Sequence, residues 1–508
     1  MTDEPFRWQP VPDSDAEAAA YERLKPQLAT LWKDVFPSND SHYTSVILPS
    51  VSTDAQTLLR HGEALVYEEV LLFLLIRLRN PKARVIYLTS LPLPPSVREY
   101  YLQFLAGIPA SHAAARLTFL SAHDASPRPL AEKILERPRL VERIRASIPD
   151  PSRAYLTVLR ATTLERRLAL RLGVPMNAAD PEVQALCTKS WARKVLREAG
   201  LEVPFGCEDL RDAHDLARAL LELMRRRPGL RRAIVKLDQS YWDEGNALVT
   251  LPREPTRERA AAALRGLASS RGDESAEDYL ARWARTGGVV EEFLEDVSGV
   301  ASGQVRINPR GQVVLTSSHE EIRGGTAGFL SEGCRFPAPD SCRERVQAGA
   351  MQVGGLLAER GLVSRLSVEF LVRERTSERE PVRLAATEIN LGVGGTTHPL
   401  LAVRFLCEGA LEPGSGYFLS VTGRPKFYRA TDRLAAPAYR GLLPEDLVEI
   451  ATLHGLGYSP QTESGALFYM LGALSEHGWV GMVAIGNTRE EAEAVHRRVL
   501  ATLARETG

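Results

Sequence analysis

The amino-acid sequence predicts an α/β protein that opens with a largely parallel sheet. Over the first third of the chain, four short apolar strand candidates alternate with helical patterns: SVILPS, RVIYLTS, RLTFLS and YLTVL. Such alternation is typical of parallel sheets with helices on their faces. After Gly303 successive strands dominate instead, which adds an α+β part. At 508 residues the chain is long enough for two to four domains.

The first unit is expected to run to about residue 184. Helical patterns lie at about 16–32 and 63–79, and a further helix resumes at Val97 after a proline-rich break. The pattern changes at Thr188, where TKSWARKVLREAG predicts a helix that begins after a threonine and stops at Gly200.

The middle of the chain predicts two helical stretches around a hairpin. Helices are expected at about 210–226 and, with a polar break near Arg271, at 254–285. Between them, AIVKL and ALVTL are strands joined by the loop DQSYWDEGN, and GGVVEEFLED is a later strand that ends in a turn.

The last third is expected to hold strands QVRINP, QVVLTSS, LSVEFLV and LAATEIN, with a charged hairpin tip at RERTSEREP. A tail follows from about Leu411 and ends in a helix over 488–505. This tail either covers the active site or forms a homodimer contact, and the sequence favours neither.

Composition excludes several classes of protein. The net charge of -1 provides no overall field toward nucleic acid or a membrane surface. The acidic first residues do not resemble a secretory signal, and the longest apolar run, Val70 to Ile76, is too short to cross a bilayer. Five scattered cysteines form no CxxC pair, so we expect neither zinc nor disulfides, and a cytoplasmic location.

The strongest chemical feature is a group of oxygen ligands on the late strands. Glu388 and Asn390 are two residues apart in a strand, so their side chains project to one face. If the strand that holds Glu369 pairs antiparallel beside them, a third ligand joins the patch. Two carboxylates and an amide suit Mg²⁺ together with phosphate oxygens. The alternative is an ordinary strand with solvated polar residues.

A glycine-rich loop directly after Asn390 favours the metal interpretation. The residues Gly392, Gly394, Gly395 and then Thr396–His398 can present backbone N–H groups to an anion. The motifs GxxxxGK[ST], GxSxG and HExxH are absent, which argues against a P-loop, a serine hydrolase or a zincin.

Lysine is rare in this chain, since only eight of the 63 basic residues are lysines. Lys236 ends a buried strand, where its charge is costly unless an anion meets it or its stem reaches water. Lys189 begins a helix, where lysines are often simply solvated, so by itself it is weak evidence for an anion-binding site. The strand VVEEFLED could offer backbone groups to an adenine edge, or be an exposed acidic strand end.

Taken in order, these features resemble the ATP-grasp superfamily. The motifs are Lys189 before REAGLEVP, VKL with its glycine-containing loop, VEEFL, and VEF…EIN…GGTTHP. The finer similarity is to peptide ligases related to the pheganomycin-forming enzyme, over roughly residues 40–480. It includes SPRPLAEKILERPRLVERIR and INLGVGGTTHPLLAVRFL.

This resemblance implies an ATP-grasp fold with an N-terminal pre-ATP-grasp domain (1–184), a lid (185–290), a catalytic subdomain with the metal site (291–410) and a C-terminal extension (411–508). It implies ATP and Mg²⁺ as cofactors, with small-molecule carboxylate and amine substrates. The implied phosphate ligands are Lys189 and Lys236, with Gly245 and Asn246 in the covering loop.

The remaining implied roles concern adenine, metal and substrate. The adenine hinge is Glu291, Glu292 and Leu294; the metal ligands are Glu369, Glu388 and Asn390; the substrate loop is Gly394, Gly395 and Thr396. Arg306 is expected to meet the γ-phosphate or an acyl phosphate, and a ribose-binding acid is either Glu295 or Asp296.

The sequence departs from this family's pattern at two places. The phosphate loop carries Tyr241 and Trp242, followed by Asp243 and Glu244, whose charges oppose phosphate unless they turn away. Relatives tend to have a cation between EIN and GGTTHP, where this chain has Gly392 and Val393. The substrate carboxylate is then expected to rely on backbone groups or on another arginine, such as Arg323.

The implied activity is an ATP-dependent carboxylate–amine ligase that forms an amide through an acyl phosphate and releases ADP and phosphate. The alternatives are an ATP-grasp phosphotransferase that forms no amide and a non-catalytic ATP-binding protein. The unusual loop supports the last, whereas the retained lysines and metal ligands oppose it.

Overall fold

A computed structural model describes residues 15–35, 40–53, 57–59, 63–105, 107–240, 244–325, 328, 330–374, 380–412 and 414–508. Tyr241, Trp242 and Asp243 therefore lie outside the described residues, as do parts of the GTAGFL and RERTSEREP segments. Among the described residues, no helix is both long and apolar enough to cross a membrane.

The N-terminal part is built on a four-stranded sheet in the order β3-β2-β1-β4, and every pair in it is parallel. The strands are β1 (Tyr43–Leu48), β2 (Ala83–Thr89), β3 (Leu117–Ser121) and β4 (Ala154–Val158). In β1, Val46 and Leu48 enter one apolar core, whereas Ile47 enters the other. Both faces of the sheet are therefore covered, as expected for parallel strands, and the predicted α/β class is confirmed.

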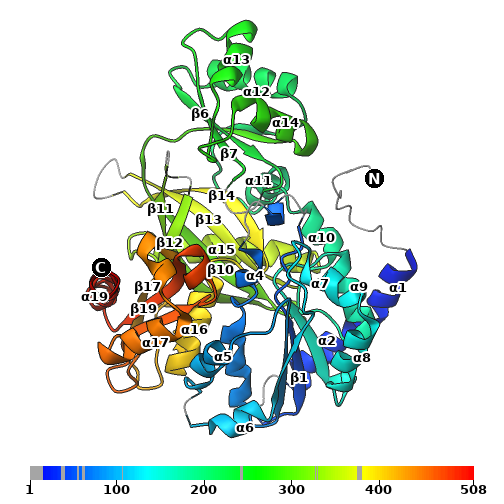
Figure 1. The fold of residues 1–508 in the computed structure, drawn as a ribbon. Coiled ribbons are helices and arrows are strands. Elements are labelled where there is room, and N and C mark those ends of the chain that lie inside the picture. Colours follow the sequence, from blue (N-terminus) through cyan, green and yellow to red (C-terminus); the bar gives the residue numbers. More distant parts are fainter. Residues whose placement is uncertain are drawn as a thin grey trace, which may run out of the picture.

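Helices surround this sheet (Figure 1). They are α1 (Asp15–Leu24), α2 (Pro26–Asp34), α4 (Ala64–Tyr67), the 3₁₀ helix η1 (Leu72–Arg79), α5 (Pro95–Leu102), α6 (Ala110–Ala114), α7 (Leu130–Leu135), α8 (Pro138–Ala146), the 3₁₀ turn η2 (Pro151–Arg153), α9 (Thr163–Leu172) and α10 (Pro181–Leu186). The core on one face uses α1, α7, α8 and α9, and the core on the other uses η1 and α5.

Two predicted helices are each divided in the structure. Pro26 occupies the first turn of α2, where a proline is tolerated, and so separates it from α1. The predicted helix over 63–79 consists of α4 and η1. Between them lie the buried carboxylates of Glu68 and Glu69, which accept hydrogen bonds from Ser90 and from the Gly472 N–H. These buried hydrogen bonds hold the segment between α4 and η1, which separates the two helices.

A second unit, at the top of Figure 1, is an antiparallel five-stranded sheet in the order β5-β9-β6-β7-β8. Its elements are β5 (Gly206–Leu210), α12 (Ala213–Arg226), β6 (Arg232–Leu237), β7 (Asn246–Thr250), α13 (Arg257–Ala263), the 3₁₀ turn η3 (Leu264–Gly266), β8 (Ala268–Ser269), α14 (Ala276–Thr286) and β9 (Gly288–Glu292). Helices α12 and α14 pack their apolar faces on this sheet. The helix that precedes the unit, α11 (Lys189–Glu198), is capped by Thr188, and Gly200 follows its end with a positive φ.

The third sheet has ten strands and runs through the catalytic and C-terminal parts. Its main path is β14-β13-β10-β11-β12-β17-β16-β15, and β19 joins β17 to β18. The strands are β10 (Val297–Ile307), β11 (Val313–Gly324), β12 (Leu330–Phe336), β13 (Ser364–Arg373), β14 (Arg383–Leu391), β15 (Ala410–Leu411), β16 (Phe418–Leu419), β17 (Pro425–Ala435), β18 (Gly465–Tyr469) and β19 (Trp479–Gly486). The helices of this region are α15 (Arg343–Glu359), α16 (Thr397–Cys407), the 3₁₀ helix η5 (Pro437–Gly441), α17 (Pro444–Leu453), α18 (Ala473–His477) and α19 (Arg489–Glu506).

The C-terminal segment after residue 411 continues this sheet. Strand β17 pairs with β12, and Arg335 lies opposite Arg429. Its strand β18 also contacts the N-terminal part, since the Phe468 N–H donates to the Tyr100 hydroxyl across 2.8 Å. The tail therefore packs on both the N-terminal and the catalytic parts.

Candidate active site

The paired strands β13 and β14 bring the three predicted metal ligands together. Glu369 lies opposite Glu388 in the antiparallel register, and Asn390 lies opposite Ser367. The amide of Asn390 donates to Glu369 Oε1 over 3.1 Å. The result is a patch of carboxylate and amide oxygens, the donor type that Mg²⁺ prefers.

Two lysines from different elements converge on this patch. Lys189 comes from the first turn of α11, and its Nζ lies 2.5 Å from Glu388 Oε2. Lys236 comes from β6, with its Nζ 3.7 Å from Glu388 Oε1 and 3.0 Å from Glu291 Oε2. A lysine that is only 5% exposed requires such partners, because burial of an unpaired ammonium is costly.

The charges in this cluster stabilise one another. Burial alone would raise the pKa of Glu388, but Lys189 and Lys236 lower it well below its usual range. Burial would likewise lower the pKa of Lys236, but Glu291 and Glu388 raise it. The cluster therefore holds ionised carboxylates and ammonium groups at neutral pH. Arg323 beside Glu369 adds a third cation, so carboxylates for a metal and cations for phosphate oxygens lie in the same site.

The predicted adenine hinge lies at the end of β9. The Glu291 side chain is 1% exposed and is bound to Lys236 and Arg193, so it does not face a ligand. The Glu292 carboxylate accepts the Phe205 N–H, and its own N–H donates to the Phe205 carbonyl over 2.8 Å. These groups are therefore used within the protein, and the chain leaves the sheet before Leu294.

The two predicted ribose-binding acids also pair with arginines. Glu295 pairs with Arg232, whereas Asp296 lies 2.8 Å from Arg373. Glu295 is the more exposed carboxylate of the two.

In the covering loop, the described ends lie close to Lys236. Asn246 is the cross-strand partner of Lys236, and the Leu237 N–H donates to the Gly245 carbonyl over 2.9 Å. A Cβ on Gly245 would lie 2.4 Å from the Ser240 side chain, so this close approach requires glycine.

Arg306 is not part of this cluster. In the register of β10 and β13, Ser302 lies beside Glu369, and Arg306 is four residues further along the strand, about 13 Å at the usual rise per residue. Its guanidinium donates to Asn177 Oδ1 over 3.0 Å and lies over the Trp32 ring. The structure thus places Arg306 away from the expected phosphate position, whereas Arg323 lies 2.7 Å from Glu369.

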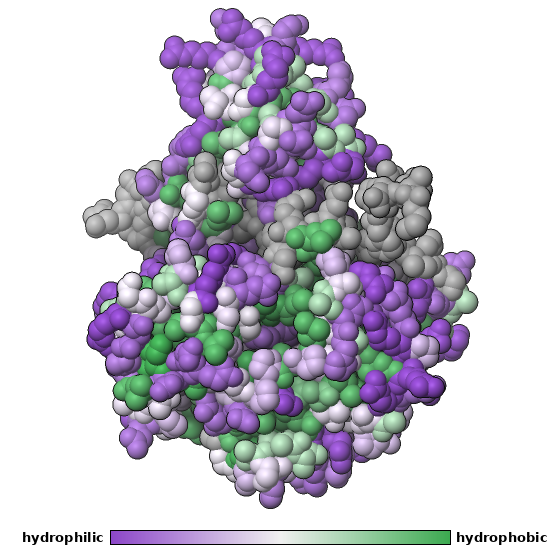
Figure 2. Space-filling model, in the orientation of Figure 1, coloured by the Kyte–Doolittle hydropathy of each residue, from purple (hydrophilic) through white to green (hydrophobic). Residues whose placement is uncertain are grey.

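The glycine loop after β14 separates two neighbouring cavities. One, of about 380 Å³, includes Lys189, Asn390, Gly394 and Gly395 in its wall. The other, of about 820 Å³, includes Glu369, Arg323, Asn390, Gly394, Gly395 and Thr396. Figure 2 shows that this face of the molecule is hollowed near its centre, beneath the mostly hydrophilic unit that carries α12–α14.

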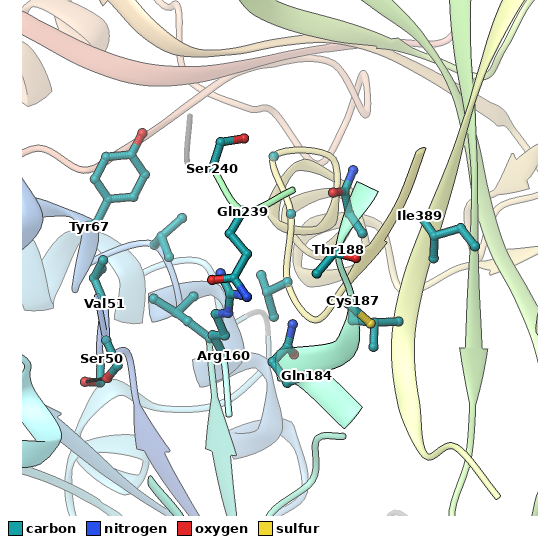
Figure 3. Close-up of a pocket in the computed structure, with 18 of the residues that line it drawn as sticks. Ser50, Val51, Tyr67, Arg160, Gln184, Cys187, Thr188, Gln239, Ser240 and Ile389 are labelled. Carbon is teal, nitrogen blue, oxygen red and sulfur yellow. Dashed lines mark hydrogen bonds between the residues drawn. The ribbon is translucent and has the colours of Figure 1, made fainter. Parts of the chain in front are cut away.

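The 380 Å³ cavity also receives residues that sequence reasoning missed. Ser50, Ser52 and Arg160 follow the carboxyl ends of β1 and β4, the edge where ligands commonly bind in parallel sheets. Figure 3 shows Arg160 and Gln239 directed into this cavity from different elements. The strand pattern alone could have indicated this edge.

A second missed contact involves the C-terminal segment. His398 Nε2 lies 2.8 Å from Asp432 Oδ1 on β17, and that oxygen also accepts the Tyr469 hydroxyl over 2.6 Å. Both His398 and Asp432 line the 380 Å³ cavity. No local pattern marks Asp432, because only the pairing of β17 with β12 brings it here.

Comparisons with known proteins show which family this chain belongs to. Residues 181–265 match the family described as IQCH-like, ATP-grasp, and residues 446–499 match the PGM1 C-terminal domain. Over 437 residues the chain is 30% identical to the L-propargylglycine--L-glutamate ligase of Streptantibioticus cattleyicolor, across 84% of this chain and 87% of that protein. It is 23% identical to the IQ motif-containing protein H of Danio rerio over 94% of this chain, and spans about half (50%) of that protein.

Two solved structures share the fold. The ADP complex of N5-carboxyaminoimidazole ribonucleotide synthetase has a TM-score of 0.50 at 12% identity, and covers 92% of this chain and 98% of its own. Biotin carboxylase from Campylobacter jejuni has a TM-score of 0.52 at 13% identity, and covers 90% of this chain and 91% of its own.

The fold and the similarity to the L-propargylglycine--L-glutamate ligase define an ATP-grasp enzyme. The chain belongs to the ATP-grasp peptide-type ligases, the family of the L-propargylglycine--L-glutamate ligase. It is accordingly an ADP-forming carbon–nitrogen ligase that uses ATP and Mg²⁺.

Proposed function

We propose that this enzyme joins the carboxylate of one amino acid or peptide to the amine of another, with the phosphates of ATP held between Lys189 and Lys236. The observation that carries the proposal is the convergence of both lysines on Glu388. The relative named for joining L-propargylglycine and L-glutamate supports amino-acid substrates.

In this proposal Glu369, Glu388 and Asn390 hold Mg²⁺, whose charge would assist phosphoryl transfer. The substrate carboxylate attacks the γ-phosphorus to give an acyl phosphate and ADP. The amine then attacks the acyl carbon, and phosphate leaves. Gly394, Gly395, Thr396 and Arg323 would position the acyl group, since they line the cavity beside Glu369.

The adenine would lie against the end of β9, with the remaining backbone groups of Glu292 and Leu294 as its partners. We propose that the chain has four parts: an N-terminal domain (1–184), a lid (185–292) that includes all of β9, a catalytic subdomain (293–410) and a C-terminal extension (411–508). We also propose a cytoplasmic location and a homodimer. Of these, the first is supported by five free cysteines among the described residues.

The test is an assay of ADP release from ATP over a panel of amino acids and dipeptides, with the products identified by mass spectrometry. Glu388→Ala should reduce the rate by about 100-fold or more, because it would weaken binding of the metal, which contributes several kcal/mol of charge stabilisation in the transition state. Glu476→Ala, at a carboxylate whose side chain is 79% exposed, is the matched control. Phosphorylated product without any amide would contradict the ligase chemistry, and full activity of Glu388→Ala would contradict the site.

A further inference from the structure

A small cavity behind the glycine loop is lined by four arginines. Arg77, Arg160, Arg306 and Arg365 all contribute to the wall of this cavity of about 40 Å³. Among the described residues that line it, there is no aspartate or glutamate. We refer to this cavity as the arginine pocket.

These arginines lie close together although their positive charges repel one another. Arg306 on β10 lies directly opposite Arg365 on β13, an arrangement that is unfavourable for like charges on neighbouring strands. Burial, with the charges of Arg404 and Arg77, lowers the pKa of Arg365 to about 10. At that value the Arg365 guanidinium remains charged at neutral pH, so it supplies positive charge to the pocket.

Contacts within the protein hold two of these guanidinium groups in place. Arg306 donates to Asn177 and lies over the Trp32 ring, with 4.1 Å from its Cζ to the ring centroid. Arg77 donates to Thr157 Oγ1 over 3.1 Å and lies over the Tyr155 ring. In the described part of the chain the Arg365 guanidinium has no hydrogen-bond acceptor. Its donors are therefore available to a ligand.

The pocket adjoins the 380 Å³ reaction cavity. Both cavities share the wall residues Leu159, Arg160, Gln184 and Val393. A group bound among the arginines could therefore extend past Arg160 toward Lys189 and Asn390. The free volume is about three times the 10–15 Å³ that one water requires, so a carboxylate fits.

We propose that the arginine pocket binds a carboxylate of a substrate that does not react, and so selects substrates with this second anionic group. The proposal rests on the proposed ligase function. Arginine forks match carboxylates with paired hydrogen bonds, and the position on β10 separates this anion from the phosphates of ATP. The group belongs either to the acid substrate, as in a dicarboxylic amino acid, or to the amine substrate, as the carboxylate of an amino acid.

The first experiment measures KM for each substrate in the wild type and in Arg365→Gln. We expect KM for the substrate that carries the second carboxylate to rise by about 30-fold, since a hydrogen bond to a charged group contributes that much binding. The KM for Mg·ATP should stay within about twofold, given the roughly 13 Å separation along β10. Arg225→Gln, at an exposed arginine at the end of α12, is the control.

Substrate analogues then identify which substrate carries the group. As the acid, glutamate is compared with glutamine and with glutamate α-amide, so that one of the two analogues keeps whichever carboxylate reacts; as the amine, amino acids are compared with their carboxamides. The pocket binds the acid if neither amide of glutamate is turned over, and it binds the amine if one amide of glutamate is turned over but the carboxamides are not. Wild-type kinetics with one amide of glutamate and with the carboxamides would overturn the proposal.

A binding measurement separates this inference from the ligase function itself. Calorimetric titration with glutarate should show binding to the wild type that Arg365→Gln and Arg306→Gln each weaken by about 30-fold. If the wild type turns over no substrate pair but binds glutarate in this arginine-dependent way, only the ligase proposal fails. If both arginine variants fold, by circular dichroism, and bind glutarate as the wild type does, the pocket proposal fails.

Discussion

The ammonium group of Lys189 lies 2.5 Å from Glu388 Oε2, and so joins the start of α11 to the end of β14. In this structure the lysine neutralises a carboxylate that we propose holds the metal. When Mg·ATP binds, the metal would take over the carboxylate, and the lysine would turn to a phosphate oxygen. The ion pair thus holds both side chains in the site before the nucleotide arrives.

Replacing Lys189 with methionine should weaken ATP binding with little change in stability. The Lys189 side chain is 18% exposed, and Glu388 retains Lys236 as a partner. Loss of a charge-assisted contact to phosphate should raise KM for Mg·ATP by about 30-fold. Lys194→Met is a suitable control, since that lysine lies on the same helix with a 50% exposed side chain. Equal KM values in the two variants would refute the role of Lys189.

The unit built from residues 200–292 should close on the nucleotide as a lid. It has its own sheet and apolar core, separate from those of the body. Closure would shield an acyl phosphate from water. Limited trypsin digestion within its arginine-rich segment 225–232 should therefore slow when Mg·ATP is added. Glu388→Ala should show no such protection, and equal cleavage rates in the wild type with and without Mg·ATP would argue against a lid.

Replacing Asp432 with asparagine should impair the amine step. Asp432 holds His398 Nε2 at 2.8 Å, which leaves Nδ1 as the basic nitrogen if Nε2 carries the proton. An attacking ammonium must lose protons, and a positioned base contributes about 100-fold or more. We expect kcat for amide formation to fall by that factor while KM for Mg·ATP is unchanged.

The control for this prediction is Tyr469→Phe, which removes the second hydrogen bond to Asp432 and a bond to the Thr431 carbonyl but leaves the His398–Asp432 contact. It should lower kcat by about tenfold, in line with the loss of one hydrogen bond to a charged group. An unchanged pH–rate profile and kcat in Asp432→Asn would exclude His398 as the base.

The stability of the protein should fall as pH decreases below about 6.5, in part because of His319. This histidine is fully buried between Gln304 and Tyr428, and burial lowers its pKa to about 3. In the unfolded chain its pKa is about 6.5, so between these values the unfolded state binds more protons. The stabilisation is complete above pH 6.5 and is lost progressively toward pH 3.

Urea unfolding at pH 7.5, 6 and 5 would measure this contribution. The free energy of unfolding should decrease by up to about 1.4 kcal/mol per pH unit more in the wild type than in His319→Gln. Parallel pH profiles for the two proteins would show that His319 binds protons equally in the folded and unfolded states, and would contradict the prediction.

Much of the architecture follows from local patterns. The strands β1 to β4, the capped helix α11 and the i, i+2 spacing of Glu388 and Asn390 were all predicted. Each depends on periodicity or on a single cap, which are properties of adjacent residues. The division of the 63–79 helix was not predicted, because it depends on hydrogen bonds between Glu68 and Ser90 and between Glu69 and Gly472.

The position of Arg306 could not be predicted from its neighbours in the sequence. As a residue on QVRI it was expected near the phosphates, but strand register places it beside Arg365, four residues from the partner of Glu369. Strand register depends on the packing of whole strands, so it cannot be predicted from a short motif. The same holds for Asp432, which reaches His398 only because β17 extends the central sheet.

The sequence by itself determined the kinds of element, the order of the motifs and the family they define, because these depend on the spacing of residues along one strand or helix. Only the tertiary structure decided which charged groups meet. Lys189 and Lys236 meet at Glu388, and His398 meets Asp432. Four arginines line one pocket that has no acid among its described lining residues. The physical reason is that electrostatic interactions depend on distance in space, and distance between segments far apart in sequence is set by the packing of sheets.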